Sequence, residues 1–323
     1  MGLYIRRKIK KMRALLTVLI ICMHISMHSQ NEKKIYTEDI DNFWAAYDII
    51  LELDNFNDKL KIINELYIDK GTIGLKSFMK LRSYNDTLWV KLIDDLPKFW
   101  NSIRPNTLKV KEKSKDIEKS VIKLNQIYPE LKDAKMYFTI GGLRSGGTTN
   151  KSMVLIGTEI ATADSSTDVT EFKSNWLPNV FSKQSIDNLV FLNIHEYIHT
   201  QQDTRGTDVL SASIREGACD FIAELVTKTQ YNSSYMQYGN NHEEEIKVQF
   251  EKEMHTKDYK NWLSNGGKMK EKADLGYFIG YKICKSYFNN STIKSLAIKN
   301  IIELDYSNKE KIQEFLRESK YFH

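Results

Sequence analysis

The sequence predicts a predominantly α, α+β fold in which a small antiparallel sheet lies next to one central helix. Apolar residues recur at three- and four-residue spacing through most of the chain, as they do on the buried face of a helix. Two short runs, residues 135–141 and 153–157, are instead β-branched or aromatic and bounded by glycine, as strands are. The composition, 41% hydrophobic and 28% charged, is typical of a helix-rich globular protein.

Residues 1–29 are predicted to be a signal peptide, so the mature protein is expected in the periplasm or outside the cell. Basic residues precede the apolar run 14–22, and small or polar residues follow it to Ser29. The run is short for a transmembrane helix, and an uncleaved N-terminal anchor is the alternative. Cys22 follows Leu-Ile-Ile and is similar to a bacterial lipoprotein box. Ile21 is bulky where such boxes carry a small residue, so simple cleavage is favoured over lipid anchoring.

The positive charge of the chain is concentrated in this leader. Without its six basic residues, 41 of the 47 lysines and arginines remain against 42 acidic residues. The mature protein is therefore close to neutral, and nothing in it indicates a surface for a nucleic acid. We expect no nucleic-acid partner.

Residues 30–131 are predicted to form an N-terminal helical region. Apolar positions from Ile40 to Leu51 mark the first helix, and Thr37 is its expected cap. Further helices are indicated around residues 60–67, 78–96 and 117–127, with Pro97 kinking or ending the third region. The aromatic side chains of these helices are expected in the core rather than on a binding surface.

The predicted catalytic region, residues 132–323, begins with the two strands. The glycine-rich segment 141–150 between them suggests phosphate binding at first sight, but it contains no Gly-Lys-Ser/Thr and no complete G-x-G-x-x-G. We interpret it as a flexible hairpin connection. The polar residues 161–170 are predicted to form a surface loop.

The central helix is expected from about Ser185 to Gln202 and carries His195-Glu196-Tyr-Ile-His199. Histidines four residues apart project from one face of a helix, where two neutral imidazoles can hold a zinc ion. The carboxylate of Glu196 would then take a proton from metal-bound water. The alternative, two histidines satisfied within the core, leaves the nearby carboxylates unexplained.

The next helix is predicted over about residues 207–229, and further helices are plausible around 243–260, 271–288, 292–304 and 309–318. Gly266-Gly267 separates the first two of these four. Cys219 and Cys284 fall on predicted helices. They either pair in an oxidising compartment or are plain core residues.

A third zinc ligand is expected on the helix over 207–229, where Glu216 and Asp220 share a face. This spacing resembles the Glu-x-x-x-Asp element of the gluzincins, the metallopeptidases with two His and one Glu on zinc. The resemblance implies that Glu216 ligates zinc and that Asp220 fixes the tautomer of a ligand histidine. Asp220 as the ligand is the alternative, with Glu224 a solvated charge. Gly217 and Ala218 are expected to let this helix approach the central one closely.

The order of motifs also resembles a bacterial family of predicted zinc-dependent proteases related to gliding-motility lipoproteins. The matching elements are a strand, H-E-x-x-H, Glu-Gly-x-x-Asp-Phe and then Gly276-Tyr277-Phe-Ile-Gly280-Tyr281. The resemblance covers about residues 130–290 and implies a zincin-like fold. The Gly-Ala-Met-Glu-Asn element of the similar aminopeptidases is absent, which argues against aminopeptidase activity.

In zincins generally, the strand before the active-site helix is an edge that an extended peptide can join, and Met153–Thr158 is the candidate here. Glu196 would act as the general base and pass the proton to the leaving amine. The oxyanion needs a donor, for which Tyr277 is the first candidate and Tyr281 the second, with His242 and His255 less favoured. Packing of either tyrosine against the glycines is the alternative.

These observations lead to the expectation of an exported zinc-dependent metallopeptidase that acts on a peptide or protein substrate, with Zn2+ held by His195, His199 and Glu216. The alternative is a non-catalytic envelope protein, peripherally associated and serving binding or assembly on the same scaffold. Hydrolysis of a non-peptide amide is a third reading that the sequence does not separate. The oligomeric state is not readable from the sequence.

Overall fold

The computed structural model describes residues 33–231, 233–265 and 272–322. The predicted signal peptide, Cys22 with its less favoured lipid anchoring, and the break at Gly266-Gly267 lie outside the described residues. Residues 35–323 form one compact unit. The expected boundary near residue 131 falls in the loop that leads from the N-terminal helices into the sheet.

The N-terminal region is helical, as its apolar spacing predicted. A two-residue strand, β1 (Ile35–Tyr36), comes first, and a π-helical turn, η1 (Asn64–Ile68), extends the second helix. The helices are α2 (Glu38–Ile50), α3 (Phe56–Ile63), α4 (Ile73–Arg82), α5 (Asp86–Asp95) and α6 (Pro97–Ile127).

Helix α6 is much longer than the helix predicted around residues 117–127. The preceding helix α5 ends at Asp95, just before Pro97, as predicted, and Pro97 also occupies the first turn of α6, where its missing N–H costs nothing. Pro105 lies inside the helix. Thr37 precedes α2 as expected, although its side chain makes no capping hydrogen bond.

The sheet has four strands in the order β1-β2-β4-β3 and is mixed. Strand β2 (Lys135–Thr139) pairs in parallel with both β1 and β4 (Met153–Gly157), whereas β3 (Gly147–Asn150) pairs antiparallel with β4. The predominantly helical α+β class is thus confirmed, and the expected antiparallel sheet is wrong. The hairpin partner of β4 is β3, which lies inside the glycine-rich segment that we had interpreted as a connection.

The mixed topology also moves the sheet edge. Residues 153–158 were expected to be the edge beside the central helix, but β4 is hydrogen-bonded on both sides, by β2 and by β3. Among the residues that the structure describes, the edge strand at this end of the sheet is β3. Its sequence, Gly-Thr-Thr-Asn, is polar and begins with glycine, so it lacked the apolar character by which a strand is recognised.

The C-terminal half is helical and contains the two helices that carry the motif residues, α9 (Leu189–His199) and α10 (Val209–Thr227). The 3-10 turn η2 (Ile186–Asn188) leads into α9, and Ser185 caps it by accepting a hydrogen bond from the Asp187 N–H. The other elements are α7 (Thr158–Ala161), α8 (Trp176–Phe181), α11 (Ser234–Asn241), α12 (Glu243–Glu253), η3 (Tyr259–Asn261), α14 (Leu275–Asn290), α15 (Lys294–Ile302) and α16 (Lys309–Ser319).

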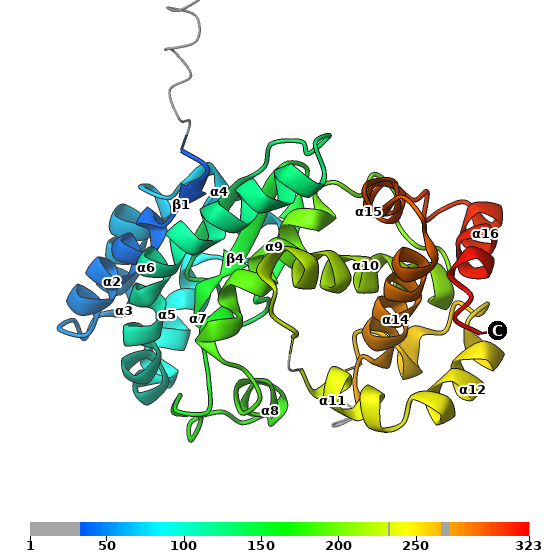
Figure 1. Ribbon diagram of the computed structural model, residues 1–323. Coiled ribbons are helices and arrows are strands. Elements are labelled where there is room, and N and C mark those ends of the chain that lie inside the picture. Colours follow the sequence, from blue (N-terminus) through cyan, green and yellow to red (C-terminus); the bar gives the residue numbers. More distant parts are fainter. Residues whose placement is uncertain (1–32, 232, 266–271, 323) are drawn as a thin grey trace, which may run out of the picture. The chain divides into compact units, whose positions relative to one another are not determined.

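Helix α10 is packed between α9 and α14 (Figure 1). Its approach to α14 is the closer one because glycines meet there: a Cβ on Gly217 would collide with the backbone of Gly280, and one on Gly280 would collide with the carbonyl of Ser213. Gly217 therefore serves the contact with α14, and the expectation that it brings α10 close to α9 is wrong. Helix α9, besides its contact with α10, contacts β3, β4 and α6.

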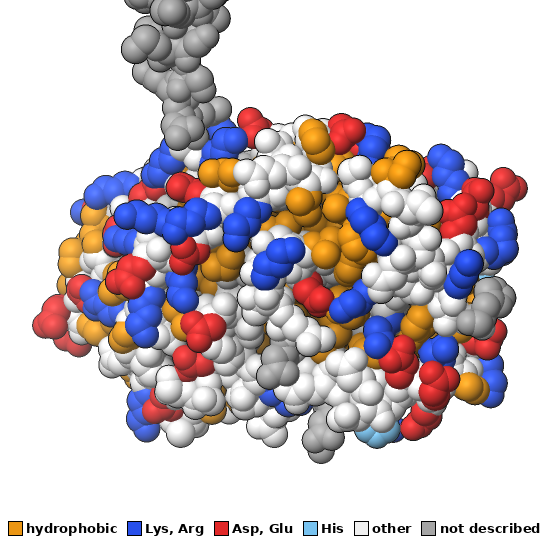
Figure 2. Space-filling model, in the orientation of Figure 1, with side chains coloured by type: hydrophobic (Ala, Val, Ile, Leu, Met, Phe, Trp, Pro, Cys, Tyr) orange, Lys and Arg blue, Asp and Glu red, His pale blue; other side chains and the backbone are white. Residues whose placement is uncertain are grey.

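Buried apolar side chains from Ile35 to Leu316 form one core cluster. Cys219 and Cys284 are buried free thiols within it. On the face drawn in Figure 2, basic and acidic side chains are interspersed, and hydrophobic ones gather near the middle of the view. Among the described residues no helix has the length and apolar character needed to cross a membrane.

Candidate metal centre

Two helices bring the motif residues together. His195 and His199 lie on the face of α9 that is turned toward α10, and Glu216 and Asp220 lie on the facing side of α10. The start of α10 is fixed by a capping box, in which the Asp208 carboxylate accepts from the Ser211 N–H and the Ser211 side chain bonds back to the Asp208 backbone. The four side chains thus meet between two packed helices.

Three potential ligand atoms converge at one point. Glu216 Oε2 lies 3.6 Å from His195 Nε2 and 3.0 Å from His199 Nε2. Ligands of a tetrahedral zinc ion, each about 2.0–2.1 Å from the metal, lie roughly 3.3 Å from one another. The observed separations bracket that value.

The outer nitrogen of His195 is held by a carboxylate. His195 Nδ1 lies 2.7 Å from Asp220 Oδ1, and the hydroxyl of Tyr235 donates to Asp220 Oδ2 at 2.8 Å. Because an ionised carboxylate can only accept, Nδ1 carries the proton. When the ring is neutral, as a metal ligand must be, Nε2 presents its lone pair toward Glu216.

The outer nitrogen of His199 is held by an amide. Gln202 Oε1 lies 2.7 Å from His199 Nδ1, while Gln202 Nε2 donates to the carbonyl of Arg215 and to the hydroxyl of Tyr306. These two acceptors fix the orientation of the amide, so Oε1 accepts from Nδ1–H of His199. The lone pair of Nε2 in the neutral ring again faces Glu216.

Two imidazole lone pairs and a carboxylate oxygen at such distances repel one another unless positive charge lies between them, as a metal ion or as protons on the two ring nitrogens. The donor set of two nitrogens and one carboxylate oxygen is the one that zinc takes in many protein sites, and the hydrogen bonds to both outer nitrogens are the usual support of such ligands. The residues present therefore fit a zinc ion. A bound zinc supplies Lewis acidity and the rigidity of a metal crosslink between α9 and α10.

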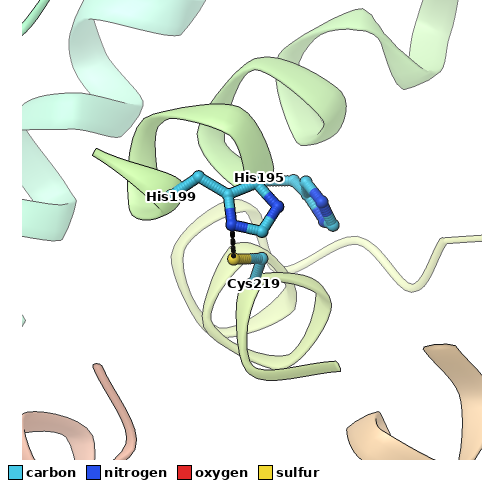
Figure 3. Close-up of side chains that lie close together, drawn as sticks. All are labelled: His195, His199 and Cys219. Atoms are coloured by element: carbon cyan, nitrogen blue, oxygen red, sulfur yellow. Dashed lines mark hydrogen bonds between the residues drawn. The ribbon is translucent and has the colours of Figure 1, made fainter. Parts of the chain in front are cut away.

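Cys219 is near the histidines but on the wrong side to complete this set. Its sulfur lies 3.3 Å from His199 Nδ1, as the dashed line in Figure 3 shows, and 3.6 Å from Gln202 Oε1. That nitrogen already donates to Gln202 and points away from Glu216. Burial raises the pKa of the Cys219 thiol well above its usual value, which disfavours the thiolate that a metal requires. Cys219 is a core residue of α10.

The pKa values of His195 and Glu216 also indicate that positive charge is favoured between the two histidines and Glu216. Burial opposes the charged form of His195, but hydrogen bonds to Asp220 and Glu216 outweigh it and raise the pKa of His195 to about 10. Burial would also raise the pKa of Glu216, but the two histidine rings hold that pKa well below its usual range.

Glu196 and Tyr277 lie beside the converging ligands. Within the described residues the Glu196 carboxylate has no hydrogen-bonding partner, and a Cβ on Gly147 of β3 would come within 2.8 Å of its Oε1. The ring of Tyr277 is stacked near that of His195, with centroids 6.2 Å apart. The adjacent charge of Glu216, together with burial, raises the pKa of Tyr277 well above its usual value, so its hydroxyl keeps its proton.

The remaining oxyanion candidates lie elsewhere. The Tyr281 hydroxyl donates to Glu224 Oε2 at 2.6 Å and accepts from Lys285 Nζ, so Glu224 is an ion-paired partner rather than a solvated charge. His242 is hydrogen-bonded to the carbonyl of Tyr238, and His255 is exposed. None of these residues lines a cavity beside His195 and His199.

Two cavities flank Glu196 and share it and Gly147 as walls. One, of about 590 Å³, lies over His195, His199 and Glu216. The other, of about 920 Å³, lies between α9, β4, α7 and the segment around Tyr231 and Tyr235.

Sequence reasoning missed three groups of the site. Gln202 is three residues after His199, a helical spacing that could have indicated its role. Tyr235, which donates to Asp220, belongs to α11, a helix that was not predicted. Arg215 precedes Glu216 directly on α10, and its Nη1 donates to Glu216 Oε1 at 3.1 Å. No sequence pattern predicts the contact of Tyr235 with Asp220 or that of Arg215 with Glu216.

A family model described as gliding motility protein GldB matches residues 25–322, nearly the whole chain. The chain belongs to the GldB family. No curated protein and no solved structure matches it. The match includes the N-terminal helices, for which the sequence offered no motif, and it supports the gliding-motility part of the resemblance but not the gluzincin part.

Membership of the GldB family corrects the expected activity. We had expected an exported zinc metallopeptidase, with Glu196 activating water and a peptide as the substrate. A family of gliding motility proteins fits the non-catalytic envelope alternative better, and the protease terms find no support in it. The H-E-x-x-H motif was misleading because it specifies a pair of helical histidines and a nearby carboxylate, which a metal centre without catalysis also uses.

Proposed function

We propose that the chain is an exported, envelope-associated protein of gliding motility that acts by binding a partner rather than by catalysis. The observation that carries the proposal is the GldB family match over residues 25–322. The basic and apolar leader predicted over residues 1–29 supports export. The protein is best regarded as a zincin-like scaffold used for assembly, in which a metal centre joins two core helices.

The metal centre fits this role because its residues serve the packing of the molecule. His195, His199 and Glu216 would hold Zn2+ between α9 and α10, with Asp220 and Gln202 orienting the two rings. A metal bound only by the folded chain stabilises it. The proposed ion therefore fixes the wall of the two cavities that flank Glu196.

Complementation of a deletion strain tests the proposal. In the organism that carries the gene, deletion is expected to abolish spreading on a surface, and the chain with Glu196→Gln is expected to restore it to within about twofold of wild type. The substitution keeps the size of the side chain and removes the carboxylate that was expected to act as a general base. Glu216→Gln, which removes a proposed ligand, is expected to restore it poorly.

The amount of each variant exported is measured alongside by immunoblotting of cell fractions. A Glu196→Gln chain that is exported at the wild-type level, binds zinc and still fails to restore spreading would show that the carboxylate has a chemical role. That result would overturn the non-catalytic assignment.

A further inference from the structure

Three arginines line the cavity over the two histidines. Arg82 ends α4, Arg205 lies in the loop between α9 and α10, and Arg215 belongs to α10. The charged lining is completed by Glu196 and Glu216, so three cations face two carboxylates. A divalent metal at the proposed site would raise the surplus of positive charge further. A concave wall with a surplus of one sign of charge attracts a ligand of the opposite sign.

Two of these guanidinium groups are unpaired. Arg215 donates to Glu216 Oε1 and to the carbonyl of Thr204, which fixes it in the wall. The side chains of Arg82 and Arg205, in contrast, have no hydrogen bond or ion pair to any described residue. A planar guanidinium with free donors is well matched to a carboxylate, which it can bind with two parallel hydrogen bonds.

The adjoining cavity has a different character. Its walls include Ile156, Ile160, Leu192, Tyr231 and Tyr235, and it meets the arginine-lined cavity at Gly147 and Glu196. It is suited to apolar side chains, as most ligand cavities are.

One side chain that lines this second cavity carries a buried polar atom without a partner. Asn193 is 1% exposed, and its Nδ2 donates to the carbonyl of Leu189. Its Oδ1 is buried without a hydrogen bond in the described structure. A buried acceptor of this kind costs free energy until an N–H group satisfies it. The amide group of a peptide provides such a donor.

We infer that the two cavities together bind an acidic peptide segment of a partner protein. A carboxylate of the segment occupies the cavity lined by Arg82, Arg205 and Arg215, and neighbouring apolar residues enter the other cavity, where an N–H donates to Asn193. This inference rests on the proposed function and names the class of partner that the protein binds. The apolar second cavity and the unpaired acceptor favour a peptide over a free phosphate as the source of the anion.

The test uses the mature full chain loaded with zinc and two pools of fluorescein-labelled peptides. The pools are identical, with Leu, Ile, Val or Phe at the neighbouring positions, except that one carries Glu and the other Gln at the central position. Fluorescence anisotropy is expected to show at least about tenfold tighter binding of the Glu pool, since only the carboxylate forms charge-assisted hydrogen bonds with the guanidinium groups. Higher salt should reduce the difference.

The variant Arg82→Gln/Arg205→Gln is expected to lose most of this discrimination while keeping its zinc. Arg317→Gln, an equivalent change at an exposed arginine of α16, is the matched control and should bind as wild type does. Asn193→Leu should weaken binding of both pools equally.

Equal affinity for the two pools in the wild-type protein would overturn the inference, as would full discrimination by the double arginine variant. Binding of inorganic phosphate without preference between the pools would assign the arginines to a phosphate ligand and also overturn it. The motility complementation by Glu196→Gln is measured separately, so the proposed function can survive the failure of this inference.

Discussion

At the scale of single residues, the candidate metal centre depends on side chains that are not ligands. The sequence could place His195, His199 and Glu216 because helical periodicity puts them on facing sides of two helices. The resemblance implied that Asp220 orients one ring, which the structure identifies as that of His195, but nothing in the sequence analysis named Gln202 as the partner of His199. Gln202 in turn is oriented by Tyr306, which is more than a hundred residues away in sequence. Such contacts depend on the tertiary fold alone.

We predict that Asp220→Asn lowers the affinity for zinc by about 10- to 100-fold, because the variant loses the negative charge that orients and polarises the His195 ring. Tyr235→Phe, which removes only a hydrogen bond to the same carboxylate, should have a smaller effect. Competition with a chromophoric chelator measures both. Unchanged affinity in Asp220→Asn would mean that His195 does not ligate the metal through Nε2.

A second prediction concerns Glu159, a fully buried carboxyl group that accepts from the N–H groups of Gly141 and Leu143. Burial raises its pKa from 4.5 to about 7 despite these hydrogen bonds. Between these two values the folded protein holds a proton that the unfolded chain has released. The free energy of unfolding should therefore fall as pH rises from about 4.5 to 7, by on the order of 3 kcal/mol.

Urea unfolding at a series of pH values, in the wild type and in Glu159→Gln, measures this contribution. The glutamine variant cannot titrate at this position, so its stability should fall less over that range. Parallel pH profiles for the two chains would contradict the assignment of Glu159 as the group that titrates.

At the scale of elements, most helices and the two apolar strands β2 and β4 were predictable, whereas strand β3 and the order of the strands were not. Long apolar periodicity located α2, α9, α10 and α16 to within a few residues, because each buries one face. Strand β3 escaped notice because it is short, polar and only half-buried, so its place is set by pairing with β4 rather than by its own composition. The first turns of helix α6 were missed because Pro97 was interpreted only as the end of a helix. Proline is also favourable in the first turn of a helix, which is where Pro97 lies.

The contact between α10 and α14 gives a third prediction. Gly280→Ala should destabilise the fold by about 3 kcal/mol, since the new methyl group would collide with the backbone of Ser213, which cannot move as a side chain does. Asn289→Ala, at an exposed position of the same helix, is the control and should have little effect. Chemical denaturation measures both variants. A Gly280→Ala chain as stable as wild type would mean that the two helices can separate without cost.

At the scale of the whole molecule, the N-terminal helices and the metal-centre helices share one core. Helix α6 contacts α9 and α10, and the carbonyl of Lys132 accepts from the Gln201 amide at the end of α9. The sequence indicated two regions because recognisable motifs occur only in the second. The presence or absence of motifs does not show whether two regions pack around one core. The GldB family match likewise runs through both regions.

Because residues 35–323 form one compact unit, we predict a single cooperative thermal transition for the chain that begins at residue 30. The fragment 132–323 should fail to fold alone, since its sheet and α9 would lose their contacts with α4 and α6. Scanning calorimetry tests the first statement and near-UV circular dichroism of the fragment tests the second. Two separate transitions, with a folded fragment, would show independent domains.

The central claim is that His195, His199 and Glu216 hold one zinc ion between α9 and α10. Metal analysis of the purified mature chain by mass spectrometry tests it most directly, in the wild type and in Glu216→Ala, with Glu224→Ala as the control acidic residue on the same helix. The claim predicts about one zinc per chain in the wild type and the control, and a large loss in Glu216→Ala. A wild-type chain that stays metal-free after incubation with zinc, or a Glu216→Ala chain that binds it equally well, would contradict the claim.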